Sequence, residues 1–417
     1  MPTISPLSSR EVSIAPATSQ EPYFSFQMPR ALHGSSLQSL KIHGGKSSIV
    51  HCLSRLWNRL CYPFHLMYNW LSSSAQSIYS KLSDSPPPSK FPDCIAEEVI
   101  DPHAYAHTLS HPHKIAVYNA LVQGRALGGP IHFYKYTLND RRHIADCPIF
   151  HMSGNPSPLI SWVNGPPFSY EASTQETTHW VVNFADSHIM GYSDGALLAQ
   201  NELQVLEHPP LSHVKTAMAQ KGHAYMKKNE IYLIKNVERF GILDTQTPLA
   251  NGRTLYGNQF AQASSANILS HLHVANSPQP SNIVFMAAPH IGNNLKGKPY
   301  QKNNMEQLFY TAFNAFWSSN YNSAPGSSCQ IHTGNWGAGA FGNSAKVSHL
   351  LQIAAAHAAG VNAQFYPLDQ APAFHSAQLL FNEIMRQYPE MSVDQFLDHL
   401  AEHAQVYDLL YGHGNGT

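Results

Sequence analysis

The residues best suited to chemistry in this chain form a glycine-rich stretch, TGNWGAGAFG, at positions 333–342. Its glycines, Gly334, Gly337, Gly339 and Gly342, are each separated from the next by one or two other residues. Glycine lets backbone N–H groups approach an anion closely, and a helix that follows such a loop adds a favourable dipole. We therefore infer a phosphorylated or nucleotide-like ligand for this stretch.

The elements on both sides of the stretch support this inference. An apolar run over 330–333 predicts a strand, and apolar residues at helical spacing over 347–354 predict a helix that Asn343 or Ser344 caps and Gly360 ends. The loop lacks the Lys-Ser/Thr of a P-loop and the order of the dinucleotide fingerprint. Large aromatic residues, Trp336 and Phe341, alternate with its glycines, which favours ligand binding over a plain turn.

A carboxyl group upstream is a candidate general acid. The pattern over 196–206 predicts a helix on which Glu202 follows Leu198 by four residues and precedes Val205 by three, so it shares an apolar face. Burial raises the pKa of such a carboxyl, as an acid in glycoside cleavage requires. The alternative is an exposed glutamate on an amphipathic helix. Nearby, Ser193 or Asp194 is expected to cap the helix, and Glu207 is expected to be solvated.

Both stretches resemble one known family. Residues 333–342 are similar to the diphosphate-binding loop of poly(ADP-ribose) glycohydrolases, macrodomain enzymes whose motif reads T-G-N-W-G-C-G-A-F-G-G-D. Residues 184–189 and 200–202 resemble the family signature, in which F-A-N, three glycines and Q-E-E stand at the same spacing. Over residues 180–407 the resemblance implies a macrodomain-like α/β fold and hydrolysis of ADP-ribosyl bonds, without a cofactor or a metal ion.

The resemblance also implies roles for individual residues. Glu202 would be the general acid, and Asn201 or Asp186 would hold the ribose hydroxyls. Backbone groups of the loop would bind the diphosphate, Asn335 would position the ribose or phosphate, and Phe341 would pack on the ribose. The complete ligand-binding set comprises Gly191, Gln200, Gly334, Asn335, Gly337, Ala338, Gly339, Ala340, Phe341 and Tyr366.

For two aromatic residues that the family uses to bind its substrate, this sequence offers more than one candidate. The family's adenine-stacking phenylalanine aligns near Leu368, so Phe365 or Tyr366 is expected to stack on the base. The tyrosine that clasps the substrate has Phe240 or Tyr256 as its candidates.

The catalytic signature departs from the family pattern. Asn201 replaces a glutamate, and its amide can bond hydroxyl groups but cannot act as a base. Met190 and Tyr192 replace two glycines, and Tyr192 adds bulk that would restrict the site to single ADP-ribose units or block catalysis. Asp186 is either a substitute carboxylate or a solvated turn residue. The competing interpretation is therefore an ADP-ribose-binding module or an interaction protein without catalysis.

Composition limits the remaining function classes. The formal net charge is −1 and only 12% of residues are charged, so no basic footprint indicates direct binding of nucleic acid. Five cysteines without metal or disulfide spacing favour a reducing, cytoplasmic compartment. Histidines recur every four residues at 103, 107 and 111, but Pro112 interrupts a helix there, and we expect no metal site.

The chain divides into segments of different composition. Residues 1–45 are Ser/Pro-rich and predicted to be disordered, 46–82 form an amphipathic helical segment, and 83–92 are a Pro-rich linker. Residues 53–71 are expected to contact a membrane surface or a protein, or to pack on the main domain. Such an N-terminus also suits a secreted bacterial effector acting in a host cell.

The glycohydrolase-like domain is expected over 93–417, with a helical accessory part at 93–150 and a macrodomain core at 151–417. Within it, strands alternate with helices, which predicts an α/β fold with a mixed sheet between helices. The predicted strands cover 180–184, 231–235, 283–287, 330–333 and 363–366.

Overall fold

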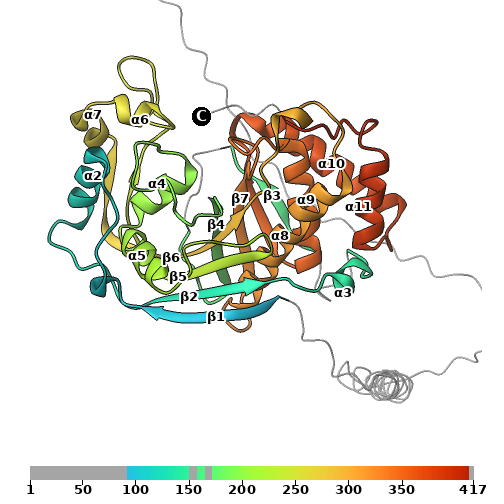
Figure 1. Cartoon of the computed structure of the whole chain (residues 1–417), viewed down its shortest axis with the longest axis horizontal. Coiled ribbons are helices and arrows are strands. Elements are labelled where there is room, and N and C mark those ends of the chain that lie inside the picture. Colours follow the sequence, from blue (N-terminus) through green and yellow to red (C-terminus); the bar gives the residue numbers. More distant parts are fainter. Residues whose placement is uncertain (1–91, 150–156, 165–170, 413–417) are drawn as a thin grey trace, which may run out of the picture. The chain divides into compact units, whose positions relative to one another are not determined.

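The computed structural model describes residues 92–149, 157–164 and 171–412 (Figure 1). The segments predicted at 1–45 and 46–82, and all but the last residue of the linker at 83–92, lie outside these ranges. None of the helices in the described ranges is both long and apolar enough to cross a membrane.

The described strands form one mixed eight-stranded sheet, in the order β1-β2-β5-β6-β4-β7-β8-β3. The first four strands in this order are antiparallel, and from β6 onward each neighbour is parallel. This confirms the prediction of an α/β fold, and all five predicted strands lie within observed ones. Their bounds are β1 Asp93–Ile100, β2 Ile131–Thr137, β3 Ile160–Trp162, β4 Thr177–Ala185, β5 Glu230–Leu243, β6 Leu272–Ala287, β7 Ser328–Gly334 and β8 Asn362–Tyr366.

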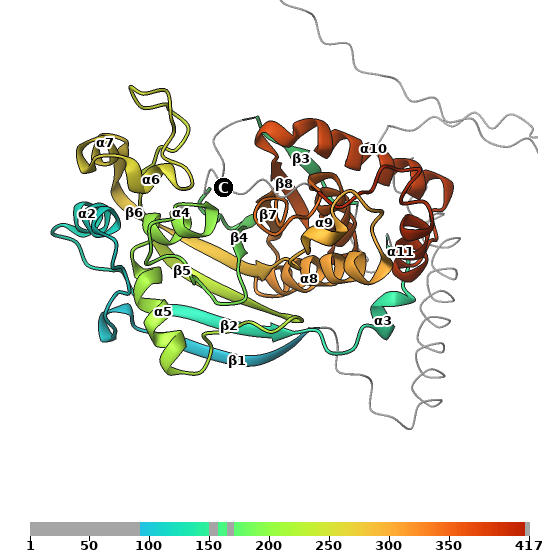
Figure 2. The same cartoon turned by 45° about the horizontal axis from the view of Figure 1, so that its top comes forward.

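Helices cover both faces of the sheet (Figures 1 and 2). Alternation along β6 shows the two layers: Val284 and Met286 pack in the cluster that includes α8 and α9, whereas Ile283 and Phe285 pack with α5. The bounds are α2 Pro112–Val122, α3 Arg142–Ala145, α4 Gln200–Glu207, α5 Pro210–Gln220, α6 Gln259–Gln262, α7 Ser265–Ser270, α8 Lys302–Tyr321, α9 Ala345–Ala359, α10 Ala371–Gln387 and α11 Val393–Glu402. Short 3₁₀ helices are η1 Pro102–Ala104, η2 Asn293–Leu295 and η3 Leu368–Gln370.

The part expected to be a helical accessory, 93–150, differs from the prediction. It supplies β1 and β2, which extend the sheet beyond β5, because alternate residues of β2 such as Ile131 and Phe133 are buried against the α5 side. Its longest helix, α2, begins at Pro112. Proline suits the first position of a helix, where its missing N–H has no partner to lose, so it starts this helix and does not interrupt it.

Helix α4 begins later than the predicted residue 196. Leu198 forms a β-bridge with Gly257 on both of its backbone groups, at 3.3 and 2.8 Å, and Ala199 is extended. Glu207, expected to be solvated, is buried at 3% exposure because Arg239 forms an ion pair with it at 2.7 Å. Gly360 ends α9 with a left-handed φ of 65°, as predicted.

Candidate active site

Two buried contacts hold the glycine-rich stretch between β7 and α9. The indole Nε1 of Trp336 donates to the carbonyl of Met286 at 3.0 Å, which ties the loop to the end of β6. The hydroxyl of Ser348 on α9 donates to the carbonyl of Trp336 at 2.6 Å. Because Trp336 is only 1% exposed, its ring serves as an anchor within the protein and presents no surface to a ligand.

Gly337 is the position of this loop that most requires glycine. Its φ is 73°, and an added Cβ would lie 2.6 Å from the Cβ of Ala288. The amide Nδ2 of Asn343 donates to the carbonyls of Gly337 at 3.2 Å and Pro289 at 2.9 Å. The hydroxyl of Tyr300 donates to Asn343 Oδ1 at 3.1 Å, so Asn343 closes the loop from behind.

The middle of the loop faces outward. Gly339 and Ala340 are exposed, while Ala338 and Phe341 are half-buried. Among the described contacts, the N–H groups of Gly339, Ala340 and Phe341 donate to no protein oxygen. Three consecutive unpaired donors before a helix N-terminus are an arrangement suited to an anion. The Phe341 ring meets His290 edge-on, with centroids 5.8 Å apart.

Asn335 is a clamp as well as a candidate ligand residue. Its Nδ2 donates to the carbonyl of Pro367 at 2.9 Å, and its Oδ1 accepts from Nε2 of His349 at 3.0 Å. His349 is fully buried, and desolvation lowers its pKa to about 3, so the ring is neutral. One Nδ2 hydrogen remains for a ribose or phosphate oxygen.

The two rings predicted to stack on a base are both interior. Phe365 is 0% exposed and packs against Phe374, and Tyr366 is 2% exposed. Successive residues of β8 point to opposite faces, and both faces are covered at this point. The structure therefore gives no support to adenine stacking by either ring. Leu368, with a φ of 51°, is 42% exposed just beyond them.

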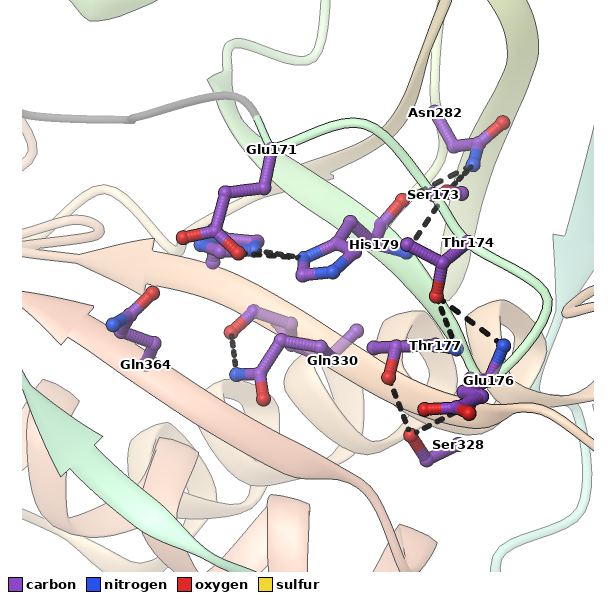
Figure 3. Close-up of polar contacts among 12 residues, drawn as sticks. Glu171, Ser173, Thr174, Glu176, Thr177, His179, Asn282, Ser328, Gln330 and Gln364 are labelled. Atoms are coloured by element: carbon purple, nitrogen blue, oxygen red, sulfur yellow. Dashed lines mark hydrogen bonds and ion pairs between the residues drawn. The ribbon is translucent and has the colours of Figure 1, made fainter.

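Tyr366 instead belongs to a buried polar network across β4, β7 and β8, of which Figure 3 shows the contact between His179 and Glu171. Its hydroxyl donates to Gln364 Oε1 at 3.1 Å and lies 3.1 Å from Nδ1 of His332. The other nitrogen of His332 lies 2.8 Å from Nδ1 of His179, which is 3.8 Å from Glu171. Desolvation lowers the pKa of His332 to about 3, so this network below the loop contains a neutral imidazole.

At the end of β4, Asp186 makes a turn. Its Oδ1 accepts from the N–H of His188 at 2.9 Å and from the Ser187 hydroxyl at 3.3 Å. A short polar side chain that bonds the backbone two residues on stabilises such a turn. Of the two alternatives from sequence, the turn role is the one observed. A role in holding ribose stays a prediction.

The residues around Gly191 show how the altered glycine triplet fits. An added Cβ at Gly191 would lie 2.8 Å from the carbonyl of His188, so this glycine is required. Met190 takes a left-handed φ of 51° with its side chain buried, at the cost that such a backbone imposes on a residue other than glycine. Tyr192 is 59% exposed beside them.

Gln200 links α4 to β4. Its Oε1 accepts from the N–H of Phe184 at 2.7 Å, and its Nε2 donates to the carbonyl of Val182 at 3.0 Å. Both ends of the amide are thus bound to the strand backbone, and the side chain places the first turn of α4 beside the end of β4. Its predicted contact with ligand stays a prediction.

Glu202 is buried at 2% exposure, as the apolar pattern predicted. Its Oε2 accepts from the N–H of Ala199 at 3.0 Å and its Oε1 from Nδ2 of Asn201 at 3.1 Å. Burial raises the pKa of Glu202, against the opposing effects of the Lys114 charge and these hydrogen bonds. Oδ1 of Asn201 is buried without a hydrogen-bond partner in the described structure, next to this carboxyl.

Of the two clasp candidates, only Tyr256 lies at the site. Its hydroxyl accepts from the N–H of Gln200 at 3.1 Å, and its ring is 38% exposed. Burial of the hydroxyl raises the pKa of Tyr256, and the charge of Glu202 adds to the rise. Phe240 is fully buried in a separate cluster with Leu243.

The loop and the signature segment meet at Phe184. A Cβ added at Gly334 would lie 3.7 Å from Cζ of Phe184, whose backbone N–H is bound by Gln200. Sequence reasoning missed a further member, Lys114, because it lies before the resembling region and carries no motif. No cluster of three or more potential metal ligands occurs in the described ranges.

Part of the chain matches a known protein family. Residues 169–373 match the model of the poly(ADP-ribose) glycohydrolase family, which has the macro domain fold. Among solved structures, the poly(ADP-ribose) glycohydrolase of Deinococcus radiodurans in complex with ADP-ribose is 15% identical, with a TM-score of 0.39 over 65% of this chain and 97% of that chain. The apo form of the same enzyme is 13% identical, with a TM-score of 0.37 over 63% of this chain and 96% of that chain.

A mutant of the Oceanobacillus iheyensis macrodomain is 12% identical, with a TM-score of 0.30 over 54% of this chain and 92% of that chain. No curated protein matches the sequence. Through residues 169–373, the chain is a distant member of the poly(ADP-ribose) glycohydrolase family of macro domain fold.

Proposed function

We propose that this protein binds ADP-ribose and hydrolyses the glycosidic bond that joins its distal ribose to a modified protein or to a further ADP-ribose unit. The family match and the Deinococcus radiodurans neighbour, which was solved with ADP-ribose, support the ligand class. The diphosphate would lie on the N–H groups of Gly339, Ala340 and Phe341. The reacting ribose would lie toward the N-terminus of α4.

The observation that carries the proposal is the burial of the Glu202 carboxyl at the start of α4. Burial raises the pKa of its carboxyl, so it retains a proton at a higher pH than an exposed glutamate does. Proton transfer to the leaving oxygen or nitrogen would accompany cleavage of the bond to the anomeric carbon. A water molecule would then attack that carbon, and the free Oδ1 of Asn201 would accept a hydrogen bond from a ribose hydroxyl.

A second candidate function, an ADP-ribose-binding module, is favoured by one specific observation. Both oxygens of Glu202 accept hydrogen bonds from the protein itself, one from the Ala199 N–H and one from Asn201. A carboxyl used in this way stabilises the helix start without any substrate. In this alternative, the loop would bind ADP-ribose and Glu202 would be structural.

Calorimetric titration of ADP-ribose into the full chain tests the ligand that both candidates share. Gly339→Glu places a carboxylate among the proposed phosphate donors, and Gly339→Gln adds similar bulk without charge. A Cβ at Gly339 meets no atom within 4 Å, so both variants should fold. We expect wild type to bind in the micromolar range, the glutamate variant to lose binding, and the glutamine variant to bind more tightly than the glutamate variant.

Absence of binding to the wild-type protein would overturn both candidates. Binding that is equal in wild type and Gly339→Glu would remove the loop from the ligand site. When binding is established, release of ADP-ribose from singly modified and polymer-modified protein distinguishes the hydrolase from the binding module. The two substrates also test whether Tyr192 restricts the site to single units.

A further inference from the structure

Lys114 is a buried lysine that has no direct carboxylate partner among the residues that the structure describes. It lies on α2 and is 0% exposed. Its Nζ donates to three backbone carbonyls, those of Leu197 at 2.6 Å, Ser193 at 3.0 Å and Tyr192 at 3.4 Å. An ammonium group has three hydrogens to donate, so these carbonyls account for all of them. Burial of a charge is costly unless it is satisfied in this way.

A second lysine binds the same segment differently. Lys215 on α5 forms an ion pair with Asp194 and donates to the Ser193 hydroxyl at 3.3 Å. Its charge is therefore neutralised by direct contact. The carboxylates whose charges act on Lys114 are Glu202 first and Asp194 second, and neither forms a direct ion pair with it among the described contacts. Both lysines thus bind the same segment, but only Lys215 forms a direct ion pair with a carboxylate, that of Asp194.

The segment that Lys114 binds, 192–197, leads directly into the catalytic helix. It is followed by the bridge between Leu198 and Gly257 and then by α4, whose third residue is Glu202. A shift of the three carbonyls would therefore move the start of α4. Small displacements of catalytic groups reduce turnover strongly, by about a hundredfold for 1 Å.

We propose that Lys114 is a positioning residue of the candidate active site, which fixes the segment entering α4 and supplies the positive charge that faces Glu202. The inference rests on the proposed function to the extent that Glu202 is its acid. Helix α2 precedes residues 169–373, so the site includes a residue outside the part that matches the family.

The charges around Lys114 give the expected direction of its effect. Burial lowers the pKa of Lys114 to about 8, Glu202 and Asp194 raise it, and Lys215 lowers it further. His111, at the start of α2, has a lowered pKa from burial and from the charges of His113 and Lys114. The positive charge of Lys114 lowers the pKa of Glu202, so removal of that charge should raise the Glu202 pKa further.

Lys114→Met, which keeps an unbranched side chain one atom shorter and removes its charge, tests the proposal. The readout is the carboxyl titration of Glu202, followed by carbon NMR in glutamate-labelled full-length protein and assigned by its loss in Glu202→Gln. We expect the titration midpoint to rise in Lys114→Met. Lys215→Met is the matched control, because its ammonium pairs with Asp194, and it should leave the Glu202 midpoint unchanged.

Turnover gives a second readout. In Lys114→Met, kcat should fall about tenfold to a hundredfold through misplacement of α4, with KM nearly unchanged. The basic limb of the kcat profile should move to higher pH, because Glu202 holds its proton longer. A lysine with only a structural role would lower the amount of folded protein without moving this limb.

The reciprocal measurement keeps the proposal testable when Lys114→Met does not fold. Glu202→Gln replaces a carboxyl by an amide of the same shape, and nitrogen NMR of the lysine side chains should then show a lower pKa for Lys114. An unmoved Glu202 midpoint in Lys114→Met, or an unmoved Lys114 pKa in Glu202→Gln, would overturn the inference. Because neither titration requires turnover, an inactive wild-type protein would overturn the proposed function and not this coupling.

Discussion

The glycine-rich loop at 333–342 and the signature segment at 184–202 are held in place by different means. The loop is fixed mainly by neutral contacts: a buried indole, the amide of Asn343, and the imidazole of His349 behind Asn335. The signature segment is fixed by buried charges, with Lys114 and Lys215 on the chain that enters α4.

The difference teaches that binding and chemistry place different demands on a sequence. An anion site of backbone donors needs small residues and a fixed loop, and the loop here follows the family motif up to Gly342 except at Ala338. General acid catalysis needs one particular side chain in one environment, and the signature here differs from the family at Asp186, Met190, Tyr192 and Asn201. The two proposed functions are therefore separable by mutation, and each of the following predictions addresses one side of this comparison.

Glu202→Gln carries the largest expected effect. If Glu202 is the general acid, kcat should fall by about 10²–10⁴-fold, the usual contribution of such a group. ADP-ribose affinity should stay within a few-fold, because the loop donors are untouched. Turnover is measured as ADP-ribose released from a modified protein, and affinity by calorimetry. Turnover equal to that of wild type would leave Glu202 with only its helix-capping contact to Ala199.

Acid should weaken the loop side of the molecule. His332 and His349 have pKa values of about 3 in the folded protein because of burial, against about 6.5 when unfolded. As the pH falls through 6.5, the unfolded chain takes up protons on these two histidines that the folded protein does not bind. The free energy of unfolding therefore decreases as the pH is lowered. For these two groups the free energy of unfolding should drop by about 2.5 kcal/mol between pH 7 and pH 5.5. Urea unfolding at the two pH values measures this loss.

The variant His349→Gln measures how much one imidazole contributes to this loss of unfolding free energy in acid. A glutamine amide can donate to Asn335 without titrating, so the loss between pH 7 and pH 5.5 should shrink by about 1.3 kcal/mol, the share of one imidazole. On the signature side, Glu202 has the opposite sign: its raised pKa makes its charge a cost at neutral pH that protonation relieves. A stability that is flat from pH 7 to pH 5.5 in wild type would contradict the imidazole argument.

The fold was largely accessible from sequence because hydrophobic periodicity reports burial. The five predicted strands were correct, since each places alternate or consecutive apolar residues in the sheet, as Ile283 to Ala287 do. The start of α4 was wrong because Leu198, an apolar residue that fits the helical period, is used in a bridge to Gly257. That bridge joins residues far apart in sequence, and no local pattern encodes it.

The site was accessible only in part, for a similar reason. The motif identified the loop, and the apolar face identified the burial of Glu202. Long-range pairing decided the rest: Glu207 is buried because Arg239 reaches it from β5, and Lys114 joins the site from α2. Tyr366 is an aromatic residue in a suitable place along the chain, but both faces of β8 are covered at this point, so its ring lies in the interior.

A pair of alanine substitutions in the loop carries the smallest expected effect and tests its rigidity directly. Gly337→Ala places a Cβ 2.6 Å from the Cβ of Ala288 at a φ of 73°, whereas Gly339→Ala meets no atom within 4 Å. The first should therefore cost about 2 kcal/mol of stability and weaken ADP-ribose binding, because the backbone donors shift when Ala288 is displaced. The second should change both quantities little.

Urea unfolding and calorimetry on the two variants give the result. If Gly337→Ala binds ADP-ribose as well as Gly339→Ala does, the geometry that the neutral contacts impose on the loop is not what binds the diphosphate. The difference proposed here, between a loop whose fixed backbone binds the diphosphate and a signature segment held by buried charges, would then not hold for the loop. If only Gly337→Ala loses affinity while Glu202→Gln keeps it, binding depends on the loop and chemistry on α4.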